Sequence, residues 1–288
     1  MIDPLAAGYH RRMRLDFVKM HALGNDFIVF DAPDATAIPP TAQLQALADR
    51  HTGIGFDQAL VLGPARRPDT LAFYRIFNAD GAEVEQCGNG ARCLAALVGK
   101  RRGLGSCELT LDSPAGLVHA RLLANGLVSV AMGVPNFAPE SLPFSVARAA
   151  ATYRLDVDGT TLELSAVSIG NPHAVIRVDS VATAPVDRLG PAVENHPQFP
   201  RRTNVEFLEI VTRAHVRLRV HERGVGETQA CGTGACGAVA VGRQQGWLDA
   251  EVEVDVPGGR LAVEWQRADA PIWLTGPTAT VFEGHTDL

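Results

Sequence analysis

The segment Cys87-Gly88-Asn89-Gly90-Ala91 opens an apolar stretch and recurs later in the chain as Cys231-Gly232-Thr233-Gly234-Ala235. In each copy a glutamate stands four residues before the cysteine, Glu83 in the first and Glu227 in the second. An internal repeat in a chain of this size indicates two similar lobes. We therefore expect one of the two cysteines at the equivalent place in each lobe, with the two thiols facing each other across the seam.

The pattern around the two repeats predicts an α+β fold with two pseudo-symmetric lobes. Many short stretches of alternating polarity, separated by turn residues, surround one very apolar stretch per lobe, which predicts a curved, mainly antiparallel sheet wrapped around a central apolar helix. The central helices are expected over 90–102 and 234–245, because Gly103 and Gly246 follow them as C-terminal signals.

Two further helices and the lobe boundaries complete this prediction. A helix is expected over 41–50, with Thr41 as its cap, and another over 187–193. Residues 1–132 are assigned to the N-terminal lobe and 133–276 to the C-terminal lobe, with a final strand in 277–288 returning to the first lobe.

The composition is typical of a globular protein and does not indicate a membrane or nucleic-acid-binding protein. The chain has 288 residues, of which 46% are hydrophobic and 20% charged, as in globular proteins. A net charge of −6 gives no indication of nucleic-acid binding, and no apolar run approaches the roughly 18 residues that a membrane span needs. Residues 1–12 have no apolar stretch typical of a secretory signal, so we expect a cytoplasmic protein. This segment is expected to be either a disordered extension or to lie before a true start at Met13.

The five cysteines are an odd number and argue against a disulfide framework. A zinc site built from the four cysteines nearest the repeats is a less favoured alternative, because their spacing along two helices does not suit it. No histidine has metal-ligand spacing, and we expect no metal. The remaining cysteines are interpreted as small buried hydrophobes: Cys93, Cys107 and Cys236.

A thiol at the start of a helix is expected to ionise more easily, which suits it to act as an acid or a base. The helix N-terminus carries a partial positive charge and unpaired N–H groups, so we expect Cys87 and Cys231 to ionise readily and to supply a thiolate at neutral pH. The adjoining glycines let the backbone approach an anion such as a carboxylate. The alternative is a tight strand-to-helix turn with a buried cysteine, but the duplication argues against it.

Two opposed thiols on one small molecule suit stereochemical inversion at a carbon. One thiolate removes the α-proton and the opposite thiol returns a proton to the other face. Pyridoxal phosphate usually stabilises such carbanions and needs a lysine, yet the chain has only Lys19 and Lys100, neither in a site-like context. This scarcity favours an enzyme without a cofactor, which relies on helix dipoles and hydrogen-bond donors.

Several long motifs in the chain resemble those of the diaminopimelate epimerases. They cover 19–27 (KMHALGNDF), 78–81 (NADG), 86–93 (QCGNGARC), 170–173 (GNPH) and 222–234 (ERGVGETQACGTG). The resemblance runs from about Leu15 to the last strand. It implies two similar lobes with the site between them, cofactor-free interconversion of LL- and meso-diaminopimelate for lysine and peptidoglycan synthesis, and a homodimer. Ala22 departs from the glycine expected of the family, and residues before Leu15 form an extension; neither touches a proposed role.

The resemblance also assigns roles to individual residues. Cys87 and Cys231 become the acid/base pair, and His173 and Glu222 are expected near the thiols, where they would tune ionisation. Substrate contacts are implied at Asn25, Gln58, Asn78, Gly88, Asn89, Asn171, Asn204, Glu222, Arg223, Gly232 and Thr233. By chemistry, Arg223 suits a distal carboxylate and Glu222 an ammonium; a surface ion pair between them is the structural alternative.

Two other functions remain open from the residues. A proline or hydroxyproline racemase would also use paired cysteines, although Glu222 and Arg223 favour a substrate with a distal amino acid end. A non-catalytic or redox member of the same fold would instead use the two cysteines as a disulfide switch.

Overall fold

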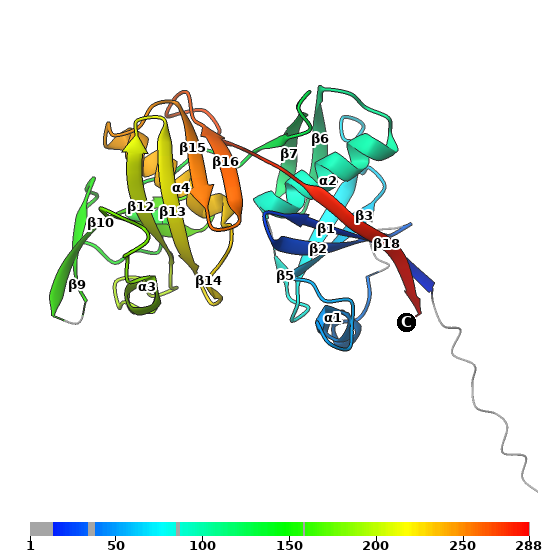
Figure 1. Cartoon of the computed structure of the whole chain (residues 1–288), viewed down its shortest axis with the longest axis horizontal. Helices are drawn as coiled ribbons and strands as arrows, with labels where there is room; N and C mark the ends of the chain where they lie inside the picture. The colour runs from blue at the N-terminus through cyan, green and yellow to red at the C-terminus, as the bar shows by residue number, and fades with distance from the viewer. Residues whose placement is uncertain (1–13, 34–37, 85–86, 158, 288) are drawn as a thin grey trace, which may run out of the picture.

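The computed structural model describes residues 14–33, 38–84, 87–157 and 159–287, which form two lobes side by side (Figure 1). The N-terminal lobe contains, in chain order, β1 (Arg14–Ala22), β2 (Asn25–Asp31), α1 (Thr41–Ala48), β3 (Gln58–Gly63), β4 (Phe73–Asn78), β5 (Glu83–Val84), α2 (Gly88–Arg101), β6 (Cys107–Ser113), β7 (Gly116–Leu122) and β8 (Val128–Ala131).

The C-terminal lobe repeats this order after a short 3-10 helix, Pro139–Ser141. It contains β9 (Tyr153–Val157), β10 (Thr160–Ser168), β11 (Pro172–Arg177), α3 (Val186–Glu194), β12 (Asn204–Thr212), β13 (His215–Glu222), β14 (Gly226–Glu227), α4 (Gly232–Gln244), β15 (Glu251–Val256), β16 (Gly259–Glu264) and β17 (Trp273–Gly276); β18 (Ala279–Asp287) ends the chain.

Strand pairing makes the two lobes equivalent. An antiparallel pair, β1 with β2 or β10 with β11, is followed by a helix that leads to a parallel partner, β3 or β12. The central helices α2 and α4 each connect a second parallel pair, β4 with β6 and β13 with β15. All other pairs are antiparallel. The predicted α+β fold of two lobes, with mainly antiparallel sheets around central helices, is therefore confirmed.

Burial explains why α2 and α4 occupy the centre of the lobes. Leu94 and Ala95 of α2 and Val239 and Val241 of α4 are fully buried and belong to one hydrophobic core that includes both helices. The outer helices α1 and α3 each cover a separate core on the other face of their sheet. Truncating a fully buried side chain such as Leu94 to alanine costs about 2–5 kcal/mol, so this shared core holds the two helix starts near each other.

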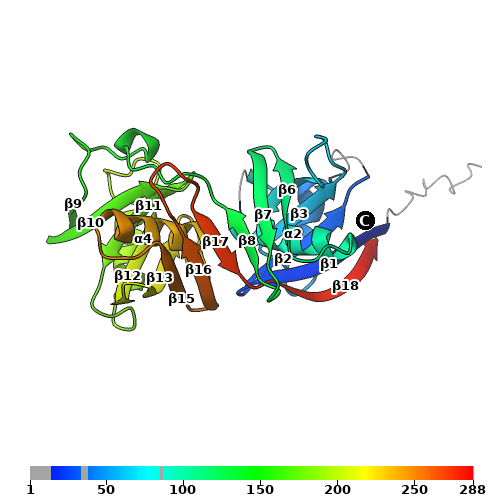
Figure 2. The same ribbon diagram turned by 90° about the horizontal axis from the view of Figure 1, so that it is seen from above.

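The two lobes are joined both by the chain and by strand pairing. The chain passes from the first lobe to the second after β8 and returns after β17. At the seam β8 pairs with β17, with Ala131 opposite Trp273. After the return, β18 pairs with β1 from Arg14 to His21 (Figures 1 and 2). The sheet therefore continues from one lobe to the other.

Helix boundaries differ in detail from the prediction. Both central helices begin two residues earlier than predicted, because the repeat cysteine itself is the N-cap. The expected cap at Thr41 is wrong: Pro40 is the N-cap of α1 and Thr41 is the first helical residue. In the described part of the chain, no helix is long and apolar enough to cross a membrane.

Candidate active site

Each repeat cysteine occupies the N-cap of a central helix. Cys87 has an extended backbone (φ −144°, ψ 110°), and its Sγ accepts a hydrogen bond from the Gly90 N–H at 3.4 Å. Cys231 repeats this arrangement (φ −104°, ψ 111°), with Gly234 N–H as donor at 3.4 Å. Sulfur thus takes the place of the serine or aspartate oxygen that usually caps a helix. Both thiols lie at the positive ends of helices.

The glycine that follows each cysteine allows the two helix starts to pack closely. A Cβ on Gly232 would lie 2.8 Å from Leu274 Cδ2 and 3.4 Å from Asn89 Oδ1, which belongs to the other lobe. A Cβ on Gly88 would lie 2.7 Å from the sulfur of Met132. A larger residue at either position would therefore displace the Met132 or Leu274 side chain that packs against the helix start.

A cluster of amides surrounds Cys87. The Cys87 thiol lies 3.9 Å from Asn25 Oδ1, which also accepts a hydrogen bond from Asn89 Nδ2 at 3.1 Å. The same Asn89 nitrogen donates to the Ala230 carbonyl at 3.1 Å, so Asn89 joins the two lobes directly in front of Cys231. Arg92, fully buried one turn into α2, donates to Asn89 Oδ1 at 2.8 Å.

A second cluster surrounds Cys231. Its Sγ lies 3.6 Å from Thr233 Oγ1, and that hydroxyl accepts from Asn171 Nδ2 at 3.4 Å. Asn171 Oδ1 lies 2.9 Å from Nε2 of the buried His173. His173 is thus linked to the Cys231 sulfur through Asn171 and Thr233.

The predicted residues at the end of β13 form the rim of the second cluster. Glu222 accepts a hydrogen bond from Thr228 Oγ1 at 2.5 Å, and no ion pair joins it to Arg223 among the described residues. Asn204 accepts from the Arg223 backbone N–H at 2.9 Å and so fixes the turn. The exposed Arg223 guanidinium donates to the Arg201 carbonyl at 3.4 Å.

The remaining predicted pair, Gln58 and Asn78, lies on adjacent strands. Gln58 Nε2 donates to Asn78 Oδ1 at 2.9 Å, as their paired positions on β3 and β4 require. Within the part of the chain that is described, no hydrogen bond connects this pair to either cysteine.

Thiol ionisation differs from the prediction. Burial raises the pKa of Cys87 to about 11, with a further increase from the Glu222 charge, while the Gly90 N–H acts in the opposite direction. Burial also raises the pKa of Cys231 well above its usual value, reinforced by Glu222 and Glu206. These shifts run against the expectation that the helix N-termini supply a thiolate at neutral pH, because desolvation outweighs the helix-terminal N–H groups.

Sequence reasoning missed three charged residues at this site. Glu206 on β12 lies 2.6 Å from His173 and is fully buried; Arg92 is fully buried on α2; Asp57 bonds to Asn25. A signal existed for the first two, because each lies inside an apolar stretch where a charge must find a partner. Asp57 gave no such signal, since an aspartate before a strand is common in turns.

The family model for diaminopimelate epimerase matches residues 17–138 and 165–281. The chain belongs to the diaminopimelate epimerase family. It is 50% identical over 276 residues to the diaminopimelate epimerase of Ectopseudomonas mendocina, covering 96% of this chain and 100% of the relative. The diaminopimelate epimerase of Pseudomonas aeruginosa strain LESB58 is 49% identical with the same coverage.

Solved structures share the fold at low sequence identity. A hydroxyproline epimerase from Agrobacterium vitis superposes with a TM-score of 0.70 at 16% identity, covering 97% of this chain and 94% of that chain. A phenazine biosynthesis protein of the PhzF family from Bacillus anthracis gives a TM-score of 0.64 at 19% identity, covering 95% of this chain and 99% of that chain. The two-lobed fold thus carries different chemistries, and the epimerase family is indicated by the sequence match.

Proposed function

We propose that this chain interconverts LL- and meso-2,6-diaminopimelate without a cofactor, in the synthesis of lysine and peptidoglycan precursors. The observation that carries the proposal is the pair of cysteines at the N-caps of the two central helices, with Asn89 joining the lobes between them. Membership of the diaminopimelate epimerase family supplies the substrate.

The proposed reaction is a two-base proton transfer by Cys87 and Cys231. The thiolate of one cysteine takes the α-proton, so the Cα–H bond breaks, an S–H bond forms and the electron pair stays on the substrate as a carbanion. The S–H bond of the other cysteine then breaks as its proton joins the opposite face of Cα. The product has inverted configuration, and the two sulfurs have exchanged protonation states, so the direction of reaction decides which one is the base.

The helix starts supply the stabilisation that a cofactor would otherwise provide. Charge that builds on the substrate carboxylate during proton removal is balanced by the free N–H groups of the first turns of α2 and α4. The glycines at these starts place no Cβ between the N–H groups and a carboxylate. Asn25 and Asn89 on one side and Asn171 and Thr233 on the other provide further polar contacts.

Glu222 links substrate binding to thiol ionisation. Its negative charge raises the pKa of both cysteines. A substrate ammonium group beside Glu222 would offset that charge, so a thiolate would form when the substrate is bound. Arg223 suits the distal carboxylate, and the other substrate contacts are proposed at Gln58, Asn78, Gly88, Asn204 and Gly232.

The test uses reduced protein and LL-diaminopimelate in heavy water, with no pyridoxal phosphate added. We expect meso product with deuterium at the inverted α-carbon, detected by NMR and chiral chromatography. Cys87→Ala and Cys231→Ala should each lower the rate by at least about 10³-fold, whereas Cys107→Ala, a partly exposed cysteine on β6, should retain activity.

Other outcomes would contradict this proposal. If deuterium exchanged into proline or hydroxyproline but not into diaminopimelate, the proposed substrate would be wrong and the two-cysteine chemistry would stand. If no amino acid exchanged and the two cysteines formed a reducible disulfide, the epimerase function would be wrong and a redox function would be favoured.

We further propose that the enzyme is a cytoplasmic homodimer with one site per chain, in which residues 1–132 and 277–288 form the first lobe and 133–276 the second. Light scattering of the purified chain tests the dimer, and a monomer at micromolar concentration would contradict it.

A further inference from the structure

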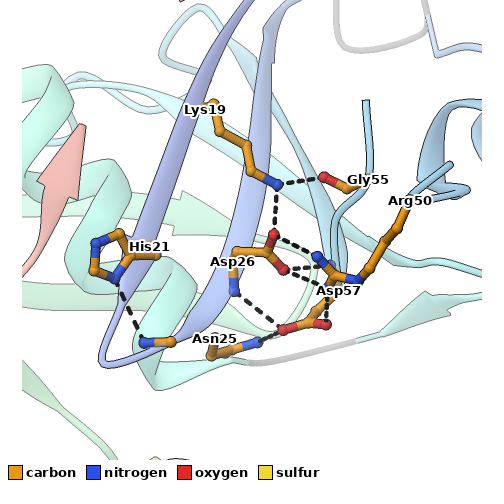
Figure 3. Close-up of polar contacts among 8 residues, drawn as sticks. Lys19, His21, Asn25, Asp26, Arg50, Gly55 and Asp57 are labelled. Atoms are coloured by element: carbon orange, nitrogen blue, oxygen red, sulfur yellow. Dashed lines mark hydrogen bonds and ion pairs between the residues drawn. The ribbon is translucent and has the colours of Figure 1, made fainter. Parts of the chain in front are cut away.

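A cluster of charged side chains lies next to Asn25 (Figure 3). Lys19 and Arg50 both bond to the Asp26 carboxylate, Lys19 at 2.5 Å and Arg50 at 2.8 and 3.0 Å. Arg50 also donates to Asp57 Oδ1 at 2.7 Å. None of these four residues has a role in the proposed reaction.

One member of the cluster reaches the active site. Asp57 Oδ2 accepts a hydrogen bond from Asn25 Nδ2 at 2.9 Å and another from the Asp26 backbone N–H at 3.1 Å. The Asn25 nitrogen is therefore turned toward Asp57. Its oxygen is turned the other way, toward the Cys87 thiol and Asn89 Nδ2.

The identities of the end groups determine this direction. An ionised carboxylate only accepts hydrogen bonds, and a guanidinium only donates them. Arg92 donates to Asn89 Oδ1, which leaves the Asn89 nitrogen to donate to Asn25 Oδ1; at the other end, Asp57 accepts from Asn25 Nδ2. The chain of hydrogen bonds therefore has a donor, Arg92, at one end and an acceptor, Asp57, at the other. If either amide between them turned by 180°, two donors or two acceptors would face each other.

We propose that Asp57 is a positioning residue for the reaction: through Asn25 it keeps a hydrogen-bond acceptor, rather than a donor, facing the Cys87 sulfur. An acceptor at that position orients the S–H group and favours the protonated form, which delivers a proton to the substrate in the direction in which Cys231 is the base. Arg50 and Lys19 hold the cluster together but do not set the direction of the amide.

Three substitutions distinguish the orientation of the Asn25 amide from the stability of the folded protein. Asp57→Ala removes the acceptor and should lower kcat by about 10- to 100-fold. KM should rise by a smaller factor, because Asn25 is only one of several proposed substrate contacts. Asp57→Asn keeps one oxygen to accept from Asn25 and the Asp26 N–H, so it should restore kcat to within about threefold of wild type. Arg50→Gln breaks contacts to both aspartates and should lower the Tm at least as much as Asp57→Ala, yet leave kcat within about threefold.

A second readout does not depend on the substrate. Alkylation of Cys87 by iodoacetamide, followed by peptide mass spectrometry over pH 7–11, reports its thiolate fraction. In Asp57→Ala the Asn25 amide is free to present its N–H₂ group to sulfur, so the alkylation curve of Cys87 should move to lower pH by about half a unit or more. The other titratable groups that act on or lie near Cys87 stay in place: Arg92, Glu222, Cys93 and Tyr74.

This proposal rests on the proposed two-cysteine reaction for its kinetic readout only. An Asp57→Ala enzyme with wild-type kcat and an unmoved Cys87 curve would overturn it, as would equal losses of kcat in Asp57→Ala and Arg50→Gln. If wild-type protein fails to epimerise diaminopimelate while Asp57→Ala still moves the curve, the proposed function fails and the positioning role stands.

Discussion

Glu206 Oε1 lies 2.6 Å from His173 Nδ1, and neither side chain is exposed. The two residues come from the neighbouring parallel strands β11 and β12. The pair lies under the start of α4, because a Cβ on Gly234 would be 3.0 Å from the same glutamate oxygen. Burial raises the pKa of Glu206, and the contact with His173 acts against that increase. A buried acid–base pair thus lies beneath Cys231, whereas the nearest polar side chains at Cys87 are the amides of Asn25 and Asn89.

Replacing Glu206 should change Cys231 alone. Glu206→Gln removes a charge that raises the pKa of Cys231 but does not contribute to that of Cys87. We expect iodoacetamide to alkylate Cys231 about 3- to 10-fold faster at pH 8, with Cys87 unchanged. Glu209→Gln, on the same strand and paired with Arg217, is the control. Equal acceleration at both cysteines would show that the substitution loosens the lobes instead.

Replacing Glu222 should affect both cysteines. Its charge raises the pKa of each, so Glu222→Gln should move both alkylation curves to lower pH. Activity should nevertheless fall, with kcat/KM lower by about 10- to 100-fold, because the substrate ammonium loses its charged partner. The control is Glu227→Gln, which breaks an ion pair with Arg219 in the same hairpin. Unchanged kcat/KM in Glu222→Gln would remove Glu222 from the substrate site.

A methyl group on Gly190 should weaken the turn that carries Arg223. A Cβ there would lie 2.6 Å from the His221 ring, which bonds to Glu194 at 2.8 Å. Glu194 also accepts from the Gly224 N–H, next to Arg223. Gly190→Ala should lower the free energy of unfolding by about 1–3 kcal/mol and raise KM. Urea unfolding and steady-state kinetics measure both, with Gly105→Ala, which meets nothing within 4 Å, as control.

Acid should remove the stabilisation that Asp26 provides. Burial would raise the pKa of this carboxyl, but hydrogen bonds and charge from Arg50 and Lys19 outweigh it and lower the pKa from 3.8 to about 2. A carboxyl with a lowered pKa in the folded state stabilises above its unfolded pKa and loses that contribution as the pH falls. Asp26→Asn should therefore cost about 1.5–3 kcal/mol at pH 6, and the difference from wild type should shrink between pH 4 and 2. A difference independent of pH in urea titrations would refute this.

Local sequence was enough to locate the central helices and the two cysteines. Repeated Gly-rich segments followed by apolar stretches predict a tight turn and a buried helix, and these depend on neighbouring residues only. The return of the last strand to the first lobe was predicted only because that strand follows the end of the second lobe. Its pairing with β1 could not be predicted, because no local pattern specifies a partner more than 250 residues away.

Thiol ionisation and the supporting charges could not be predicted in the same way. The helix-terminal N–H groups near Cys87 and Cys231 follow from their sequence position, but desolvation depends on what packs around each thiol after folding. Arg92, Glu206 and Asp57 act through residues on other strands or helices. Their roles could not be predicted, because the sequence shows that a residue is charged but does not show which residue it contacts.

The sheet and the core that continue across the seam have a consequence for unfolding. β8 and β17 form one ladder from the two lobes, and residues of α2 and α4 share one hydrophobic core. Unfolding either lobe alone would expose the apolar surface that the other lobe covers. The two lobes are therefore expected to unfold together in one cooperative transition.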